Sequence, residues 1–330
     1  MNRKHFITTL ASSALAAAVL AASAAQAQTV KLRFGHAHPE ADSQHQAAVQ
    51  FANRVKARTN GAVEIAIFPN NSLGNDNTMI QGVRGGTIDI AMSGNPFFTG
   101  IAPKLNALDL PYQFTSAQQV YKVLDGAVGR SLLDELSAHQ MKALAFWEIG
   151  FRSLANSKRA VNKADDIKGL KLRTTPNPAH IKAFQLLGAS PQPMPFAEVF
   201  PALESGAVDG HENPPTLMLA TKMHEVQKHL SLTKHAYTAL VVVMNKARFD
   251  GLKPEHQAVL LEEALAAAKF QREMNAKGEA GAIAELKAKG MQVVENPDVA
   301  GIRAIVRDET RKLFVERNGD AVLKAIEAVQ

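Results

Sequence analysis

The chain has 330 residues, contains no cysteine, and carries 37 lysines and arginines against 31 aspartates and glutamates. The lack of cysteine excludes disulfides, thiolate chemistry and a lipid-modified cysteine. The excess of basic residues is modest and forms no arginine-rich tract, which argues against a nucleic-acid partner.

Residues 1–27 have the pattern of a secretory signal peptide. Arg3 and Lys4 form a charged start, an alanine-rich apolar run follows, and Ala25-Gln26-Ala27 matches an A-x-A cleavage site. The alternative is an uncleaved membrane anchor. It is disfavoured because the apolar run is weakly hydrophobic and the small-residue site follows at once. We therefore expect export to a bacterial periplasm.

The next part of the chain alternates strands with helices. In chain order, the apolar patterns predict a strand at 30–35, a helix at 42–59, a strand at 62–68, a helix at 75–84 and a strand at 88–92. This order is typical of an α/β domain with a mainly parallel sheet.

A second α/β series begins near residue 141. The patterns predict strands at 141–147, around Arg152, at 170–174 and at 237–244, helices at 178–187 and 196–204, a long helix at 254–289 interrupted by Gly278 and Gly281, a strand at 291–294, and a helical tail at 298–329 broken at Asn318-Gly319. A helix as long as 254–289 suits a strut that crosses two lobes.

The two series share a local pattern. Gly86-Thr-Ile-Asp-Ile90 precedes Asn95-Pro96, and Gly206-Ala-Val-Asp-Gly210 precedes Asn213-Pro214. Two facing α/β lobes would place both Asn-Pro loops at strand ends, where open α/β sheets bind ligands. The alternative is a generic helix–glycine–strand connection, which recurs widely.

Two arginines are the leading candidates for ligand binding. Arg152 and Arg173 each lie on a predicted strand among apolar residues, where an unpaired charge would be costly. The guanidinium fork matches a carboxylate bidentately. These features favour a receptor for an organic anion, although one arginine could instead be the structural partner of a buried carboxylate such as Glu212.

Polar and aromatic residues near these segments are further candidates. Asn213 offers a donor and an acceptor, or it caps a helix that begins at Pro214. His36 and His211 suit hydrogen bonding to an anion, and we predict no metal site because no third ligand follows at metal spacing. Trp147 and Phe196 adjoin the same segments, although such residues are more often core. No nucleophile-elbow, phosphate-loop or dinucleotide motif is present, so we predict neither an enzyme nor a cofactor.

Several long segments together resemble the extracytoplasmic solute receptors of TRAP transporters, of the DctP type. They are residues 150–161, 167–173, 187–200, 206–214 and 225–229, including Gly206-Ala-Val-Asp-Gly-His-Glu-Asn-Pro214. The resemblance covers essentially the whole chain after residue 27. It implies an α/β fold of two lobes, of the periplasmic-binding-protein or Venus flytrap type, that closes on a carboxylate.

The resemblance also implies roles for individual residues. The carboxylate-clamping arginine falls on Arg173, a second ligand-facing arginine on Arg152, the ligand-contacting asparagine on Asn213 and the pocket aromatic on Phe196. The ligand-selecting loops of the first lobe fall around His36, Asn75, Asn95 and Phe97. This chain departs from the family at His211, where many members have glutamine.

These patterns predict a periplasmic receptor that passes an organic acid to TRAP membrane permease subunits. We expect lobe I to comprise 28–150 with about 239–278 and lobe II about 151–238 with 279–330, joined by crossovers, and we expect a monomer. The two arginines together with His36 and His211 suit more than one oxygen-rich group, which favours a small dicarboxylate such as malonate or succinate. A sugar acid, a hydroxy acid or an aromatic carboxylate stays open, as do a secreted hydrolase and a receptor that only signals.

Overall fold

The computed structural model describes residues 29–329, so the predicted signal peptide at 1–27 lies outside the described residues. The strands form one nine-stranded sheet in the order β2-β1-β3-β8-β4-β7-β5-β6, with β9 beside β8. The strands are β1 Val30–His36, β2 Val63–Phe68, β3 Ile90–Gly94, β4 Met141–Asn156, β5 Lys171–Thr174, β6 Ser190–Pro193, β7 Gly210–Asn213, β8 His229–Asn245 and β9 Gln292–Val294.

The helices cover both faces of this sheet. They are α2 Ser43–Arg58, α3 Asp76–Gly85, α4 Ala117–Asp125, α5 Ala127–Asp134, α6 Pro178–Leu186, α7 Val199–Glu204, α8 Pro215–Ala220, α9 Lys246–Asp250, α10 Pro254–Ala288, α11 Val299–Asn318 and α12 Ala321–Glu327, with short 3₁₀ helices that include η1 Asn95–Phe98, η2 Pro103–Asp109 and η5 Phe196–Glu198. Among residues 29–329, none of the helices has the length and apolar character needed to cross a bilayer.

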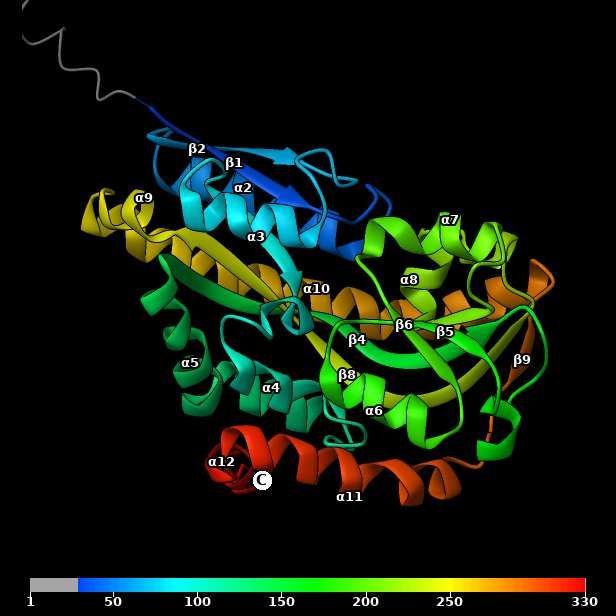
Figure 1. Cartoon of the computed structure of the whole chain (residues 1–330). Coiled ribbons are helices and arrows are strands. Elements are labelled where there is room, and N and C mark those ends of the chain that lie inside the picture. Colours follow the sequence, from blue (N-terminus) through cyan, green and yellow to red (C-terminus); the bar gives the residue numbers. More distant parts are fainter. Residues whose placement is uncertain (1–28, 330) are drawn as a thin grey trace, which may run out of the picture.

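The fold has two halves joined by long shared elements. Figure 1 shows β1 to β3 with α2 and α3 in one half and β5 to β7 with α6 to α8 in the other, while β4, β8 and α10 extend through both. Parallel pairs form inside each half, β1 with β2 and β3 and β5 with β6 and β7, whereas β4 and β8 pair antiparallel with each other along their length. The predicted crossovers and the long helix are therefore present.

Two predicted strands, at 141–147 and around Arg152, are one strand of 16 residues, β4. Register shifts relative to β8 occur at three places, one of them between Glu148 and Gly150. Gly150 has a φ of 114°, a conformation that residues with a Cβ rarely adopt. These bulges bend the strand where it passes from one half to the other.

The long helix α10 is continuous over 35 residues, so the predicted interruption at Gly278 and Gly281 is wrong. A single glycine in a helix costs only about 1 kcal/mol relative to alanine. Buried Gln271 and Arg272 hold the helix before these glycines, and buried Ala282 and Leu286 hold it after them. Tertiary packing therefore overrides the local propensity.

Candidate functional site

Arg173 lies on β5 near the centre of the molecule and is 1% exposed. Its Nε and Nη2 atoms donate to the backbone carbonyl of Met194 at 3.1 and 2.7 Å. Across residues 29–329, no carboxylate lies within ion-pair distance of its guanidinium. Burial lowers the pKa of Arg173 to about 10, although the charge of Glu212 opposes this shift. Within the described part of the chain, the direct partner of this buried cation is therefore a neutral carbonyl.

Arg152 on β4 has the opposite environment. Its Nη2 donates to Oε1 and the backbone carbonyl of Glu212 at 3.0 and 2.5 Å, and its Nε bonds the other carboxylate oxygen, Oε2. The side chain of Glu212 is 0% exposed, and Arg152 holds its pKa well below the usual range. Arg152 and Glu212 form a buried ion pair, as one of the two sequence-based interpretations of Arg152 proposed. The pair carries no net charge.

Asn213 and His211 lie beside this pair on β7. The Asn213 side-chain oxygen accepts from Nη2 of Arg152 at 2.9 Å, which leaves its amide nitrogen to donate to Nδ1 of His211 at 3.2 Å. Burial, followed by the charge of Arg173, lowers the pKa of His211 to about 3, so the ring is neutral. A neutral ring that accepts at Nδ1 carries its hydrogen on Nε2. This buried Nε2 has no hydrogen-bond partner and is a free donor.

His36 and His38 come from the loop end of β1, in the other half of the molecule. Burial lowers the pKa of His36 to about 3, and both of its ring nitrogens are engaged: Nδ1 accepts from the backbone of His38 at 3.2 Å, and Nε2 lies 3.3 Å from His45. The ring of His38 stacks on Phe196 with centroids 5.8 Å apart. This contact joins the two halves next to the arginines.

Two residues that the sequence analysis did not single out lie at the same place, Asp76 and Ser93. Asp76 is the first residue of α3 and Ser93 lies on β3, and both are at least 97% buried. Burial raises the pKa of Asp76, while the nearby charges of His38 and Arg173 lower it. An acidic residue that follows a capping asparagine after a strand-end loop was the signal available in the sequence.

Asn95 and Trp147 belong to the core of the molecule. Asn95 donates to the carbonyl of Leu105 and the carboxylate of Asp109 at 2.9 and 3.1 Å, and accepts from Ala239 at 3.1 Å. Trp147 is fully buried, packs against aromatic rings of β1 and α2, and donates to the carbonyl of Ala264 at 2.8 Å. Their polar atoms are engaged with these partners, and within the described residues neither side chain has a hydrogen bond to Arg152 or Arg173.

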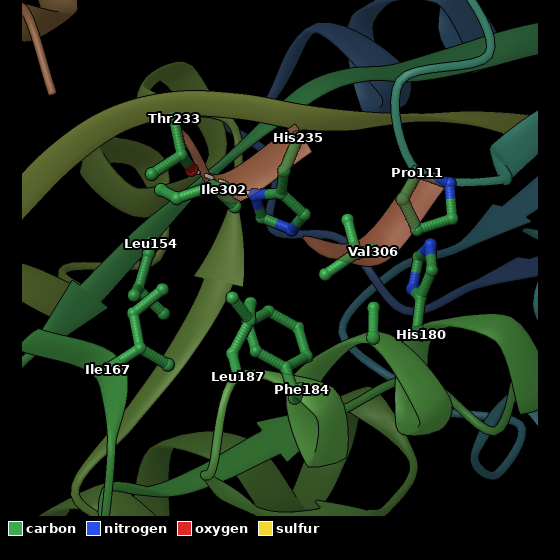
Figure 2. Close-up of a pocket in the computed structure, with 11 residues that line it drawn as sticks. Pro111, Leu154, Ile167, His180, Phe184, Leu187, Thr233, His235, Ile302 and Val306 are labelled. Atoms are coloured by element: carbon green, nitrogen blue, oxygen red, sulfur yellow. Dashed lines mark hydrogen bonds between the residues drawn. The ribbon is translucent and has the colours of Figure 1, made fainter. Parts of the chain in front are cut away.

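A small apolar cavity lies apart from the arginines. Figure 2 shows it enclosed by Leu154, Phe184 and Val306, with the rings of His180 and His235 at one side. Its volume is about 10 Å³, room for one water at most. It is too small for an organic acid. Within the described part of the chain, no group of three or more His, Cys, Asp or Glu side chains could hold a metal ion.

Comparisons with known proteins identify the family of this chain. The family described as bacterial extracellular solute-binding protein, family 7, or DctP, matches residues 34–317. The 2,3-diketo-L-gulonate-binding periplasmic protein YiaO of Escherichia coli is 43% identical over 301 residues, which cover 91% of this chain and 92% of YiaO.

Solved structures match the fold over nearly the whole chain. A TRAP periplasmic solute-binding protein from Polaromonas sp. JS666, bound to D-erythronate, superposes with a TM-score of 0.88 at 35% identity, covering 91% of this chain and 99% of that one. A second, from Sulfurospirillum deleyianum with bound succinate, has a TM-score of 0.86 at 28% identity, covering 92% and 100%. The two-lobe fold predicted from the sequence is confirmed by these neighbours.

Proposed function

The chain belongs to family 7 of the bacterial extracellular solute-binding proteins, and from this membership we propose that it captures an organic acid in the periplasm and delivers it to TRAP permease subunits. Relatives and structural neighbours are binding proteins of transporters. We propose the same for this chain, with no catalytic role. The predicted signal peptide supports export, and we propose that the receptor acts as a monomer.

One observation carries the assignment of the carboxylate clamp. Both arginines are equally buried, but Arg152 is neutralised by Glu212, whereas no carboxylate of the described residues lies within ion-pair distance of Arg173. An unpaired buried charge is costly unless a partner compensates it. A ligand carboxylate would supply that partner, so we assign the clamp to Arg173 and treat Arg152 as the residue that orients Asn213.

The same observation bears on the ligand. Among the described residues, only one of the two arginines lacks a direct ion-pair partner, so we propose a ligand with one carboxylate. The preference for malonate or succinate assumed two free arginines and loses that support here. D-erythronate in one neighbour and 2,3-diketo-L-gulonate in a relative are monocarboxylates. A dicarboxylate is the alternative, because another neighbour holds succinate.

The clamp must act together with other groups. A charge-assisted hydrogen bond contributes about 1.5–3 kcal/mol net, whereas micromolar affinity needs about 8 kcal/mol. The free Nε2–H of His211, the ring of Phe196 and the groups of the first lobe would supply the rest as the lobes close around the ligand. Closure of this kind uses a few hinge positions, and the bulges of β4 lie where the chain passes between the halves.

Binding can be tested with residues 28–330, unfolded and refolded to remove any co-purified ligand. Thermal shift against a panel of organic acids identifies binders, and calorimetry gives their affinity in the wild type and in Arg173→Gln. We expect at least a tenfold loss in the variant. Binding of an organic acid with equal affinity in both proteins would show that Arg173 is not the clamp, and binding of none of the panel would argue against the receptor assignment.

A further inference from the structure

A second cavity lies between η2, the start of α6 and the end of α11. Its volume is about 150 Å³, which matches an engineered protein cavity that binds benzene and leaves room for about six non-hydrogen atoms. Neither Arg152 nor Arg173 is among the described residues that line it. Unlike the cavity in Figure 2, it can therefore hold a small organic molecule, and it is separate from the clamp.

Part of the cavity wall is apolar. Pro103 on η2 and Leu313 and Phe314 on α11 line it, and Phe314 is buried. An apolar wall attracts a hydrocarbon group, because apolar surface gains free energy when it leaves water. This part of the cavity therefore suits a short hydrocarbon chain.

The polar part of the wall contains a buried side chain with an unused donor. Asn106 on η2 lines the cavity and is 5% exposed. Its Oδ1 accepts from the hydroxyl of Thr99 at 3.1 Å, and its Nδ2 has no hydrogen-bond partner among the described residues. The nitrogen carries two N–H groups, so at least one stays unpaired in either orientation of the amide. Since buried polar groups are hydrogen-bonded in the large majority of cases, this N–H indicates an acceptor in the cavity.

Arg317 in the last turn of α11 brings a positive charge to the same cavity. Within residues 29–329, its guanidinium has neither an ion pair nor a hydrogen bond. The dipole of α11 explains a basic residue in this turn but leaves its donors unused. The start of α6 at Pro178 also lines the cavity, and the positive end of its dipole favours an anion. The described lining contains no acidic side chain, so an anion meets no like charge there.

We infer that this cavity is a second binding site, which takes a small monocarboxylate with a short hydrocarbon chain. The carboxylate accepts from the amide of Asn106 and pairs with Arg317, whose fork of donors matches the two carboxylate oxygens. The chain packs against Leu313 and Phe314. The inference does not depend on the proposed function, because none of these residues belongs to the clamp at Arg173.

The test uses n-butyrate as the probe and residues 28–330 with Arg173→Gln as the background, so that the clamp does not contribute. Saturation-transfer NMR and calorimetry measure binding. We expect this background to bind butyrate and the added Arg317→Gln to weaken binding at least fivefold. Asn106→Asp keeps the acceptor for Thr99 but places a negative charge at the cavity, so it should weaken binding at least tenfold. The neutral 1-butanol and the cationic n-butylamine have the same chain and should bind at least fivefold more weakly than butyrate.

Lys312→Gln is the matched control, because Lys312 is an exposed cation on α11 outside the described lining of the cavity; it should leave butyrate affinity unchanged. Absence of butyrate binding, unchanged affinity in Arg317→Gln, or equal binding of 1-butanol would overturn the inference. Arg317 is exposed, so its variant still decides the question if Asn106→Asp does not fold. None of these outcomes bears on the proposed function, which is tested by Arg173-dependent binding of an organic acid.

Discussion

The guanidinium of Arg152 on β4 reaches both carboxylate oxygens and the backbone carbonyl of Glu212 on the neighbouring strand β7. The two side chains are 1% and 0% exposed. Arg173 is equally buried on β5, the strand beyond β7, and among the described residues its direct partner is the carbonyl of Met194. The same residue type therefore forms a buried ion pair at one position and lacks one at the other.

This difference predicts the stability of Arg152→Gln. The substitution leaves the Glu212 carboxylate buried without its cation, and breaking a buried ion pair costs about 3–5 kcal/mol. Urea unfolding at pH 7.5 measures the loss. The double variant Arg152→Gln with Glu212→Gln should recover part of it, since no uncompensated charge is left. A double variant less stable than both single variants would contradict the ion-pair interpretation.

The matched substitution Arg173→Gln should behave differently. It removes a buried cation that lacks an anion, so the loss of the two bonds to Met194 is offset by relief of desolvation. We expect the free energy of unfolding to change by less than about 1.5 kcal/mol while ligand affinity falls at least tenfold. Unfolding and calorimetry on the same preparation check both values, and a large stability loss would indicate that Arg173 is a structural residue.

The buried ring of His211 should make the free energy of unfolding fall as the pH is lowered. Its pKa in the folded protein is about 3, below its usual value, because burial disfavours the charged ring. The folded protein keeps the ring neutral, whereas the unfolded chain binds a proton on it below about pH 6.5. The contribution of the neutral ring to stability is therefore fully present above that pH and is lost as the pH falls toward the pKa of the folded state. Between pH 7.5 and 4.5 the loss is about 2.5 kcal/mol.

The variant His211→Gln removes this titration and keeps a donor and an acceptor at the position. Unfolding at pH 7.5 and 4.5 should show a smaller acid-induced loss in His211→Gln than in the wild type. The partly exposed His256 is the control, since His256→Gln should match the wild type at both values. Equal acid sensitivity in His211→Gln and the wild type would mean that the ring is not buried in solution.

Trp147 provides a prediction about the core. Trp147→Phe removes the indole bond to the carbonyl of Ala264 and leaves unfilled space beside Phe34 and Phe51. We expect a stability loss of about 1–3 kcal/mol, with the affinity for the organic acid unchanged within twofold. An affinity loss of tenfold in a folded variant would restore the ligand role that the sequence suggested for Trp147.

Much of the fold could be predicted from local patterns. Apolar patterns predicted β1, β2, α2 and α3 near their observed positions. The sequence missed the first half of β8, because Ser231, Thr233 and His235 make that segment look polar. In the structure these side chains are buried, with Ser231 bonded to the backbone of Val161 at 3.1 Å. Tertiary partners compensate their polarity, and no local pattern reveals such partners.

The candidate site could likewise be predicted only in part. The sequence singled out Arg152 and Arg173 as candidates from their positions on predicted strands and Asn213 from its Asn-Pro segment. It could not assign the partner of each arginine, since pairing depends on which strands become neighbours. Asp76 escaped notice because an acidic residue at a helix start is ordinary. Its carboxylate is buried close to Arg173, a residue far away in the sequence. This burial distinguishes Asp76 from a solvent-exposed aspartate at a helix start, and no local pattern reveals it.

The passage of β4, β8 and α10 through both lobes also limits how such receptors can diversify. Because β4, β8 and α10 each carry the chain from one lobe to the other, neither lobe is encoded by one uninterrupted stretch of the gene. A single recombination event between two relatives would therefore mix segments inside each lobe instead of exchanging whole lobes. If Arg173 is the clamp proposed above, new ligand preferences would arise mainly from point substitutions around it. An engineered lobe exchange would need several junctions made together.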